Sequence, residues 1–174
     1  MLSIIIPAHN EETLLGRTLD AVIAATRALD HPSEIIVVDD ASTDRTASIA
    51  LEHGVRVVAV QHRQIAATRN AGARAANGEM LLFVDADTIV NGAAVRAVVT
   101  AMQNGAVGGG CMFYFEGRLP LYARFIQAIA TPLYRVAKLA SGCFFFCKRE
   151  AFQAVGGFDE KLFAAEEAYL SRAL

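Results

Sequence analysis

Four short apolar runs divide the first half of the chain into segments of strand length. They are rich in Ile and Val and lie at residues 3–6, 34–38, 55–60 and 80–84, as expected of β-strands. The run at residues 35–38 is apolar at every position, which is typical of a strand covered on both faces in a parallel sheet. Longer Ala-rich segments with apolar residues at helical spacing separate the runs. The pattern therefore predicts an α/β fold with helices on both faces of the sheet.

The intervening segments carry signals for helix ends. Helices are expected at residues 11–28, 43–53, 64–77 and 91–103. Asn10, followed by Glu11 and Glu12, supplies a predicted N-cap with carboxylates in the first turn. Asn91 is expected to cap the fourth helix in the same way.

The pattern changes after Gly105. Three consecutive glycines at residues 108–110 are expected to allow close approach of the backbone. They precede a predicted strand at residues 111–115, a helix at 119–140 and a strand at 143–147. A Gly-Gly turn at residues 156–157 then leads to a last helix near residues 164–174.

Composition and charge narrow the class of protein. The 174 residues are 54% hydrophobic and 20% charged, which indicates one globular core and excludes a disordered chain. A formal net charge of -2 gives no argument for a nucleic-acid partner. Three cysteines fit neither a disulfide framework nor a four-ligand zinc site. No signal peptide or membrane span is recognisable, so a single cytoplasmic domain over residues 1–174 is expected.

Acidic residues gather directly after the predicted strands. Glu11 follows the first strand, Asp39 and Asp40 the second, and Asp85 and Asp87 the fourth. In open parallel α/β sheets, ligands bind at the carboxyl ends of the strands. Each acid alone is explained by an ordinary cap or turn, but three groups at one edge indicate a binding site.

The segment Asp85-Ala86-Asp87 places two carboxylates on one short turn, where they can hold a divalent cation that also binds phosphate oxygens. Arg69 is a candidate for a phosphate contact because of its planar guanidinium. The chain has no Walker-type phosphate loop, and no G-x-G-x-x-G follows the first strand. These absences disfavour kinases, NTPases and NAD enzymes and favour a nucleotide neutralised by a metal.

Five segments, taken in order, resemble those of the nucleotide-sugar-dependent glycosyltransferases of family 2. They lie at residues 3–12, 37–44, 67–72, 79–87 and 156–160. The resemblance implies the GT-A fold, a Rossmann-like mixed and mainly parallel sheet with helices on both faces. It also implies a nucleotide-sugar-binding half at residues 1–104 and an acceptor-side half at residues 105–174, which is minimal or truncated here.

The resemblance implies roles for residues around the nucleotide. Pro7, Ala8 and Glu11 would line the nucleotide pocket. Asp39 would accept a hydrogen bond from the base, and Arg69 would lie close to the nucleotide. A UDP-sugar is the favoured donor.

It also implies the metal ligand and the catalytic base. Asp85 would meet the ribose, and Asp87 would ligate Mn²⁺ or Mg²⁺ on the diphosphate. Residues 166–171 are similar to the family's acidic motif, usually Glu-Asp, so Glu167 would be the catalytic base. Glu167 departs from the usual Asp, and its longer side chain changes the reach of the carboxylate.

The expected function is therefore inverting, metal-dependent transfer of a sugar from a nucleotide diphosphate sugar to an acceptor hydroxyl on a glycan, a lipid-linked acceptor or a small molecule. One alternative is a phosphohydrolase similar to the haloacid dehalogenases, with Asp85 as nucleophile and Asp87 as acid and base. Another is a nucleotide-binding module without catalysis.

A basic segment suggests an association with membranes. Residues 117–149 contain six basic residues and no acidic one, so the rest of the chain carries 10 - 18 = -8. The expected helix at residues 119–140 either packs on the core with a solvated basic face, or lies among anionic headgroups and presents a lipid-linked acceptor. The second interpretation predicts peripheral association with the inner face of the membrane.

Overall fold

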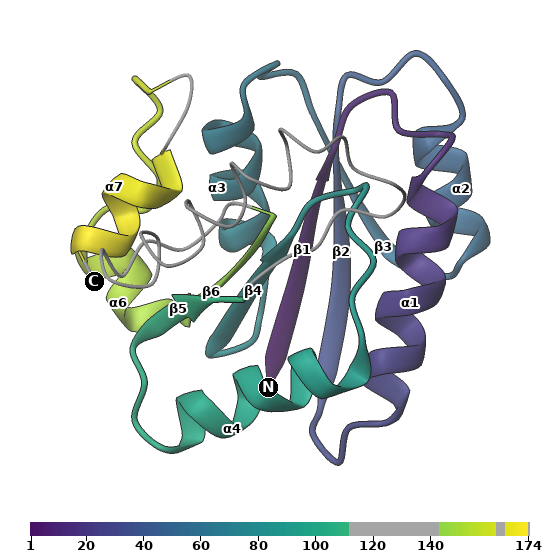
Figure 1. Ribbon diagram of the computed structural model, residues 1–174. Coiled ribbons are helices and arrows are strands. Elements are labelled where there is room, and N and C mark those ends of the chain that lie inside the picture. The colour runs from purple at the N-terminus through teal and green to yellow at the C-terminus, as the bar shows by residue number, and fades with distance from the viewer. Residues whose placement is uncertain (112–142, 163–165, 174) are drawn as a thin grey trace, which may run out of the picture.

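The computed structural model describes residues 1–111, 143–162 and 166–173 (Figure 1). In these residues one sheet has the strand order β3-β2-β1-β4-β6-β5. Neighbours among β1 to β4 are parallel, whereas β6 runs antiparallel to both β4 and β5. The mixed, mainly parallel sheet expected from the sequence is confirmed. The strands are β1 (Leu2–Ala8), β2 (Ser33–Asp40), β3 (Arg56–Val60), β4 (Met80–Val84), β5 (Gly108–Gly110) and β6 (Phe144–Lys148).

Helices cover both faces of the sheet (Figure 1). Side chains alternate along β1, so Ile4 and Ile6 enter one core and Ile5 enters the other. The first core includes residues from α1, α2 and α4, and the second includes residues from α3, α6 and α7. The helices are α1 (Leu15–Arg27), α2 (Thr46–Glu52), α3 (Ile65–Ala75), α4 (Gly92–Gln103), α6 (Arg149–Ala154) and α7 (Glu166–Ala173).

Helix α3 lies close to the centre of the sheet. A Cβ atom at Gly72 would overlap the side chains of Ile5 on β1 and Val38 on β2, so only glycine allows this approach. The first turns of α3 are thereby brought next to the carboxyl ends of these strands.

Two predicted helix starts have different outcomes. Asn91 caps α4, since its side-chain oxygen accepts a hydrogen bond from the Ala94 N–H at 2.9 Å. The prediction for Asn10 is wrong: its φ is 54°, and α1 begins only at Leu15. The Asn10 side chain instead accepts a hydrogen bond from the Thr43 N–H at 2.8 Å, in the loop that follows β2.

The second half also differs from the expected elements. The glycines of residues 108–110 themselves form β5 and pair with β6, and α6 was not predicted. The expected strand at residues 111–115 lies outside the described residues beyond Cys111, as does the expected helix at residues 119–140. Arg149, the last residue of the basic segment, donates to the Gly78 carbonyl at 2.6 Å and to the Ala73 carbonyl at 3.3 Å. This arginine therefore ties α6 to the end of α3.

Candidate active site

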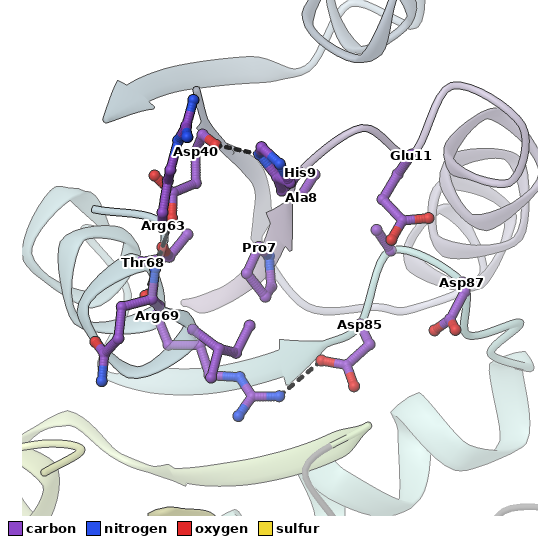
Figure 2. A pocket seen from close by; sticks show the side chains of 13 residues that line it. Pro7, Ala8, His9, Glu11, Asp40, Arg63, Thr68, Arg69, Asp85 and Asp87 are labelled. Carbon is purple, nitrogen blue, oxygen red and sulfur yellow. Dashed lines mark hydrogen bonds and ion pairs between the residues drawn. The ribbon is translucent and has the colours of Figure 1, made fainter. Parts of the chain in front are cut away.

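A pocket of about 480 Å³ opens at the carboxyl ends of β1, β2 and β4, beside the first turns of α3 (Figure 2). This is the edge where the sequence predicts a ligand. Six of the predicted binding residues line the pocket, namely Pro7, Ala8, Glu11, Arg69, Asp85 and Asp87. The structure therefore brings together residues from three strand ends and one helix.

The pocket contains a fixed pair of opposite charges. Arg69 donates from Nη2 to Oδ1 of Asp85 at 2.7 Å, and only 3% of the Arg69 residue is exposed. Its guanidinium carbon also lies 5.4 Å from the centre of the Phe158 ring, within the range of a cation–π contact. The guanidinium is thus held in one place beside the pocket, which suits it to bind an anionic ligand.

Acidic side chains form one wall of the pocket. Figure 2 shows Glu11 and Asp87 on one side, opposite Asp40 and Thr68. Burial, and then the nearby carboxylates of Asp87, Asp44 and Asp85, raise the pKa of Glu11. Mutual repulsion at this wall would be relieved by a cation.

A divalent cation fits this wall only in part. No group of three or more His, Cys, Asp or Glu side chains that could hold a metal occurs within residues 1–111, 143–162 and 169–173. Asp87 is exposed at the pocket, and carboxylate oxygen is a preferred ligand of Mg²⁺ and Mn²⁺. The carboxylate of Asp87 therefore suits a cation that takes its remaining ligands from a bound diphosphate.

Asp40 forms the opposite wall and is saturated with hydrogen bonds. Its Oδ1 accepts from the His62 N–H at 2.7 Å, and its Oδ2 accepts from the Gln64 N–H at 3.2 Å and the Thr68 hydroxyl at 2.7 Å. Burial acts to raise the pKa of Asp40, but these bonds and one from the Arg63 N–H together lower it. Asp40 thus fixes the loop before α3.

Asp39 differs from Asp40 although the two are adjacent. It does not line the pocket, and it lies on the other face of β2 because side chains alternate along a strand. Only 8% of the residue is exposed, and its Oδ1 is buried without a hydrogen-bond partner in the described protein. A buried polar atom without a partner costs stability, so Asp39 carries an oxygen that no donor of the described residues satisfies.

Hydrogen bonds join the loops after β1 and β2. Besides the Asn10–Thr43 bond, the Glu11 N–H donates to the Thr46 hydroxyl at 2.8 Å, and the Glu12 N–H donates to Asp44 at 3.1 Å. These bonds hold the backbone of Glu11 at the pocket. They also explain why Asn10 is not free to cap α1.

Some pocket residues were missed from the sequence. His9 was treated as a surface or packing residue, yet it lines the pocket, and its Nδ1 donates to the Asp40 carbonyl at 2.6 Å. Its position between Ala8 and Glu11 was the available signal. Asp40 was expected at this edge with the other acids but was given no role in binding. The lining residues that were not singled out are Arg63, Gln64, Ile65, Thr68 and Ala86.

The predicted base, Glu167, lies in the first turn of α7. This helix is on the face of the sheet that also carries α3, and its Leu170 belongs to the same core as Phe158.

No helix in the described part of the chain is long and apolar enough to cross a membrane.

Comparisons with known proteins give matches in sequence and in fold. The profile of "Glycosyl transferase family 2" matches residues 3–156. A validoxylamine A glucosyltransferase from Streptomyces hygroscopicus subsp. jinggangensis is 33% identical over 129 residues, which are 69% of this chain and 30% of the relative.

Two solved structures have a similar fold. The crystal structure of residues 1–349 of S. aureus TarS has a TM-score of 0.74 at 23% identity, covering 99% of this chain and 54% of that one. Glucosyl-3-phosphoglycerate synthase from Mycobacterium tuberculosis, solved with Mn²⁺, UDP and glucosyl-3-phosphoglycerate, has a TM-score of 0.63 at 28% identity, covering 87% and 58%. The chain thus spans from 30% to 58% of the length of these three proteins.

Proposed function

The chain belongs to glycosyltransferase family 2 and has the GT-A fold, and from this premise we propose that it transfers a sugar from a nucleotide diphosphate sugar to an acceptor hydroxyl. The observation that carries the proposal is the pocket at the carboxyl ends of β1, β2 and β4. It combines an acidic wall with a fixed arginine.

The proposed donor is a UDP-sugar. Asp39 accepts a hydrogen bond from the base, Asp85 meets the ribose, and Arg69 lies beside the nucleotide. Pro7, Ala8 and Glu11 complete the pocket. The UDP bound to the mycobacterial synthase and the UDP-GlcNAc bound to TarS in another structure support this choice.

Asp87 would hold Mn²⁺ or Mg²⁺ together with the diphosphate. When bound, such a cation stabilises the negative charge of the leaving diphosphate. The carboxylates of Glu11, Asp85 and Asp87 all line the pocket, an arrangement that a cation would stabilise, and the mycobacterial synthase was solved with Mn²⁺.

Glu167 would take the proton of the acceptor hydroxyl as the hydroxyl attacks the anomeric carbon. Displacement of the diphosphate from the opposite face inverts the anomeric configuration. The acceptor is a glycan, a lipid-linked molecule or a small molecule, and peripheral association with the membrane remains part of the proposal for a lipid-linked acceptor.

Neither alternative has a specific observation in its favour. The phosphohydrolase requires Asp85 to be a nucleophile assisted by a lysine, but Asp85 pairs with Arg69, and no lysine lines the pocket in the described part of the chain. Residues before Asp85 also supply most of the pocket. A measurement of sugar transfer distinguishes the proposed enzyme from a binding module without catalysis.

Calorimetry of UDP binding, with Mn²⁺ and with a chelator, tests the donor site. We expect binding that is clearly weaker in the chelator, and equal affinity in both would contradict the role of the metal.

A panel of UDP-, GDP-, TDP- and CDP-sugars with varied acceptors then measures transfer. Binding without transfer across the panel would favour the binding module.

Glu167→Gln tests the base, because the amide preserves size and removes basicity. We expect kcat to fall by about 10²- to 10⁴-fold, with UDP affinity nearly unchanged. Glu166→Gln is the matched control and should have a smaller effect. If Glu167 only complements the dipole of α7, turnover will be unchanged and thermal stability slightly altered.

A further inference from the structure

The segment that carries Asp85 and Asp87 is a β-turn with a buried centre. The Thr88 N–H donates to the Asp85 carbonyl at 3.0 Å, which closes the turn around Ala86 and Asp87. Ala86 is only 4% exposed and belongs to the first core, on the side of the sheet that α1 covers. The peptide between Ala86 and Asp87 is the central peptide of this turn, so its orientation decides how the Asp87 backbone is presented to the pocket.

A buried threonine holds this central peptide. Thr18 on α1 is fully buried, and its hydroxyl donates to the Ala86 carbonyl at 2.7 Å. Type I and type II β-turns differ by a flip of the central peptide, and the type II form requires a positive φ at the residue that follows this peptide. Asp87 is in that position, and its φ is not positive. The Thr18 hydroxyl therefore stabilises the peptide orientation that the Asp87 backbone adopts.

The same part of α1 also holds Glu11. The N–H of Leu15, the first residue of α1, donates to the Glu11 carbonyl at 2.9 Å. Thr18 lies three residues after Leu15, within one turn of the same helix. Figure 2 shows the Glu11 and Asp87 side chains on the same side of the pocket. One turn of α1 therefore connects the backbones of both residues of the acidic wall and restricts the distance between their carboxylates.

We propose that Thr18 is a positioning residue that, through the Ala86 carbonyl, fixes Asp87 relative to Glu11 and so sets the affinity of the acidic wall for the divalent cation that accompanies the diphosphate. The inference rests on the function proposed above. Thr18 does not line the pocket, so it acts only through the turn. Residues that orient a metal ligand contribute to metal affinity without touching the metal. Loss of the hydroxyl should therefore weaken the metal-dependent part of UDP binding alone.

Thr18→Val is the test, because a methyl group of similar size replaces the hydroxyl and cannot donate. Thr26→Val is the matched control on the same helix, since the Thr26 hydroxyl donates only within α1, to the Val22 and Ile23 carbonyls, both at 3.0 Å. We expect the Kd for UDP in Mn²⁺ to rise about 10-fold in Thr18→Val, and its Kd in a chelator to stay within about twofold of the wild-type value. Thr26→Val should change neither value. Calorimetry measures all four.

Mn²⁺ itself is the second probe. Titration of Mn²⁺ into the UDP-saturated chain, with free Mn²⁺ followed by its electron paramagnetic resonance signal, measures the affinity for the cation without any transfer of sugar. Thr18→Ser keeps the hydroxyl and should restore both the Mn²⁺ affinity and the UDP affinity. Thr18→Ala also lacks the hydroxyl but has no group that crowds the Ala86 carbonyl, so it replaces Thr18→Val should the latter not fold.

The outcomes separate the inference from the proposed function. Wild-type Mn²⁺ affinity in Thr18→Val or Thr18→Ala would overturn the role of Thr18 and leave the proposed function intact. An equal loss of UDP affinity in Mn²⁺ and in the chelator, or a loss that Thr18→Ser does not restore, would overturn it in favour of a merely structural role.

The wild-type chain decides the remaining cases. If it binds UDP equally well in Mn²⁺ and in the chelator, the proposed role of the metal fails, and the inference about Thr18 is overturned with it. If it binds UDP only with Mn²⁺ but transfers no sugar, the proposed catalysis fails, whereas the Mn²⁺ titrations still decide whether Thr18 positions Asp87.

Discussion

The two walls of the pocket hold carboxylates whose pKa values are shifted in opposite directions. Asp40 is 3% exposed, accepts several hydrogen bonds and has a lowered pKa. Glu11 is partly exposed, faces Asp87 and Asp85, and has a raised pKa. Glu11 follows β1 and Asp40 is the last residue of β2 in the same sheet, so their sequence contexts are alike.

The difference separates a structural acid from acids available to a ligand. The charge of Asp40 is already stabilised by donors of the protein, so a ligand would gain little from it. Glu11 and Asp87 repel each other, so a cation that enters between them relieves an existing cost. Hydrogen-bond saturation, more than position after a strand, therefore indicates which carboxylates bind a cation.

The largest effect on stability is expected at Asp40. Asp40→Asn replaces an accepting oxygen by a donor that faces other donors, which should lower the free energy of unfolding by about 2 to 3 kcal/mol. Asp39→Asn is the matched control. Because Oδ1 of Asp39 has no partner, stability should change little, while UDP binding should weaken even in a chelator. Denaturant unfolding measures the first effect and calorimetry the second. Equal destabilisation by both substitutions would contradict the distinction between the two aspartates.

The next effect is expected at Asp87. Asp87→Ala should weaken UDP binding in Mn²⁺ by about 10- to 100-fold, which corresponds to about 1.4 to 2.7 kcal/mol, and should leave binding in the chelator unchanged. Asp20→Ala is the control, since Asp20 is an exposed acid on α1 that does not line the pocket, and the change in net charge is the same. An equal loss of affinity in both variants would indicate an effect of overall charge.

Much of the first half could be predicted because its signals are local. Apolar runs define parallel strands, and acids placed directly after them meet at one edge for geometric reasons. That rule placed Glu11, Asp85 and Asp87 in the pocket. It did not separate Asp39 from Asp40, because their difference depends on donors that lie more than twenty residues away, such as Gln64.

The errors come from contacts between residues far apart in the sequence. Asn10 and Asn91 both precede a helix, yet only Asn91 acts as a cap, because Asn10 bonds to Thr43, 33 residues away. The bond from Gln64 to the Glu160 carbonyl spans 96 residues. No local pattern reports such pairs.

Whether residues 1–104 and 105–174 act as donor and acceptor halves stays a prediction.

The smallest expected effect concerns Glu11 and depends on pH. Its raised pKa means that the folded chain binds this proton more tightly than the unfolded chain does, for which the ordinary value is 4.5. The associated stability is complete below pH 4.5 and is lost as the pH rises through the raised pKa.

Glu11→Gln removes this titration. The variant should therefore be more stable than the wild type at pH 7 by a few tenths of a kcal/mol, as for solvent-screened charges, with the difference vanishing near pH 4. Thermal melts from pH 4 to pH 8 measure it, with Glu12→Gln as the control, because the adjacent Glu12 is exposed and accepts from the Arg45 N–H at 3.1 Å. Adding UDP and Mn²⁺ should cancel or reverse the gain, because a bound cation favours the ionised Glu11. A gain of equal size at every pH would mean that it arises from packing, and the acidic wall would then hold no repulsion for a cation to relieve.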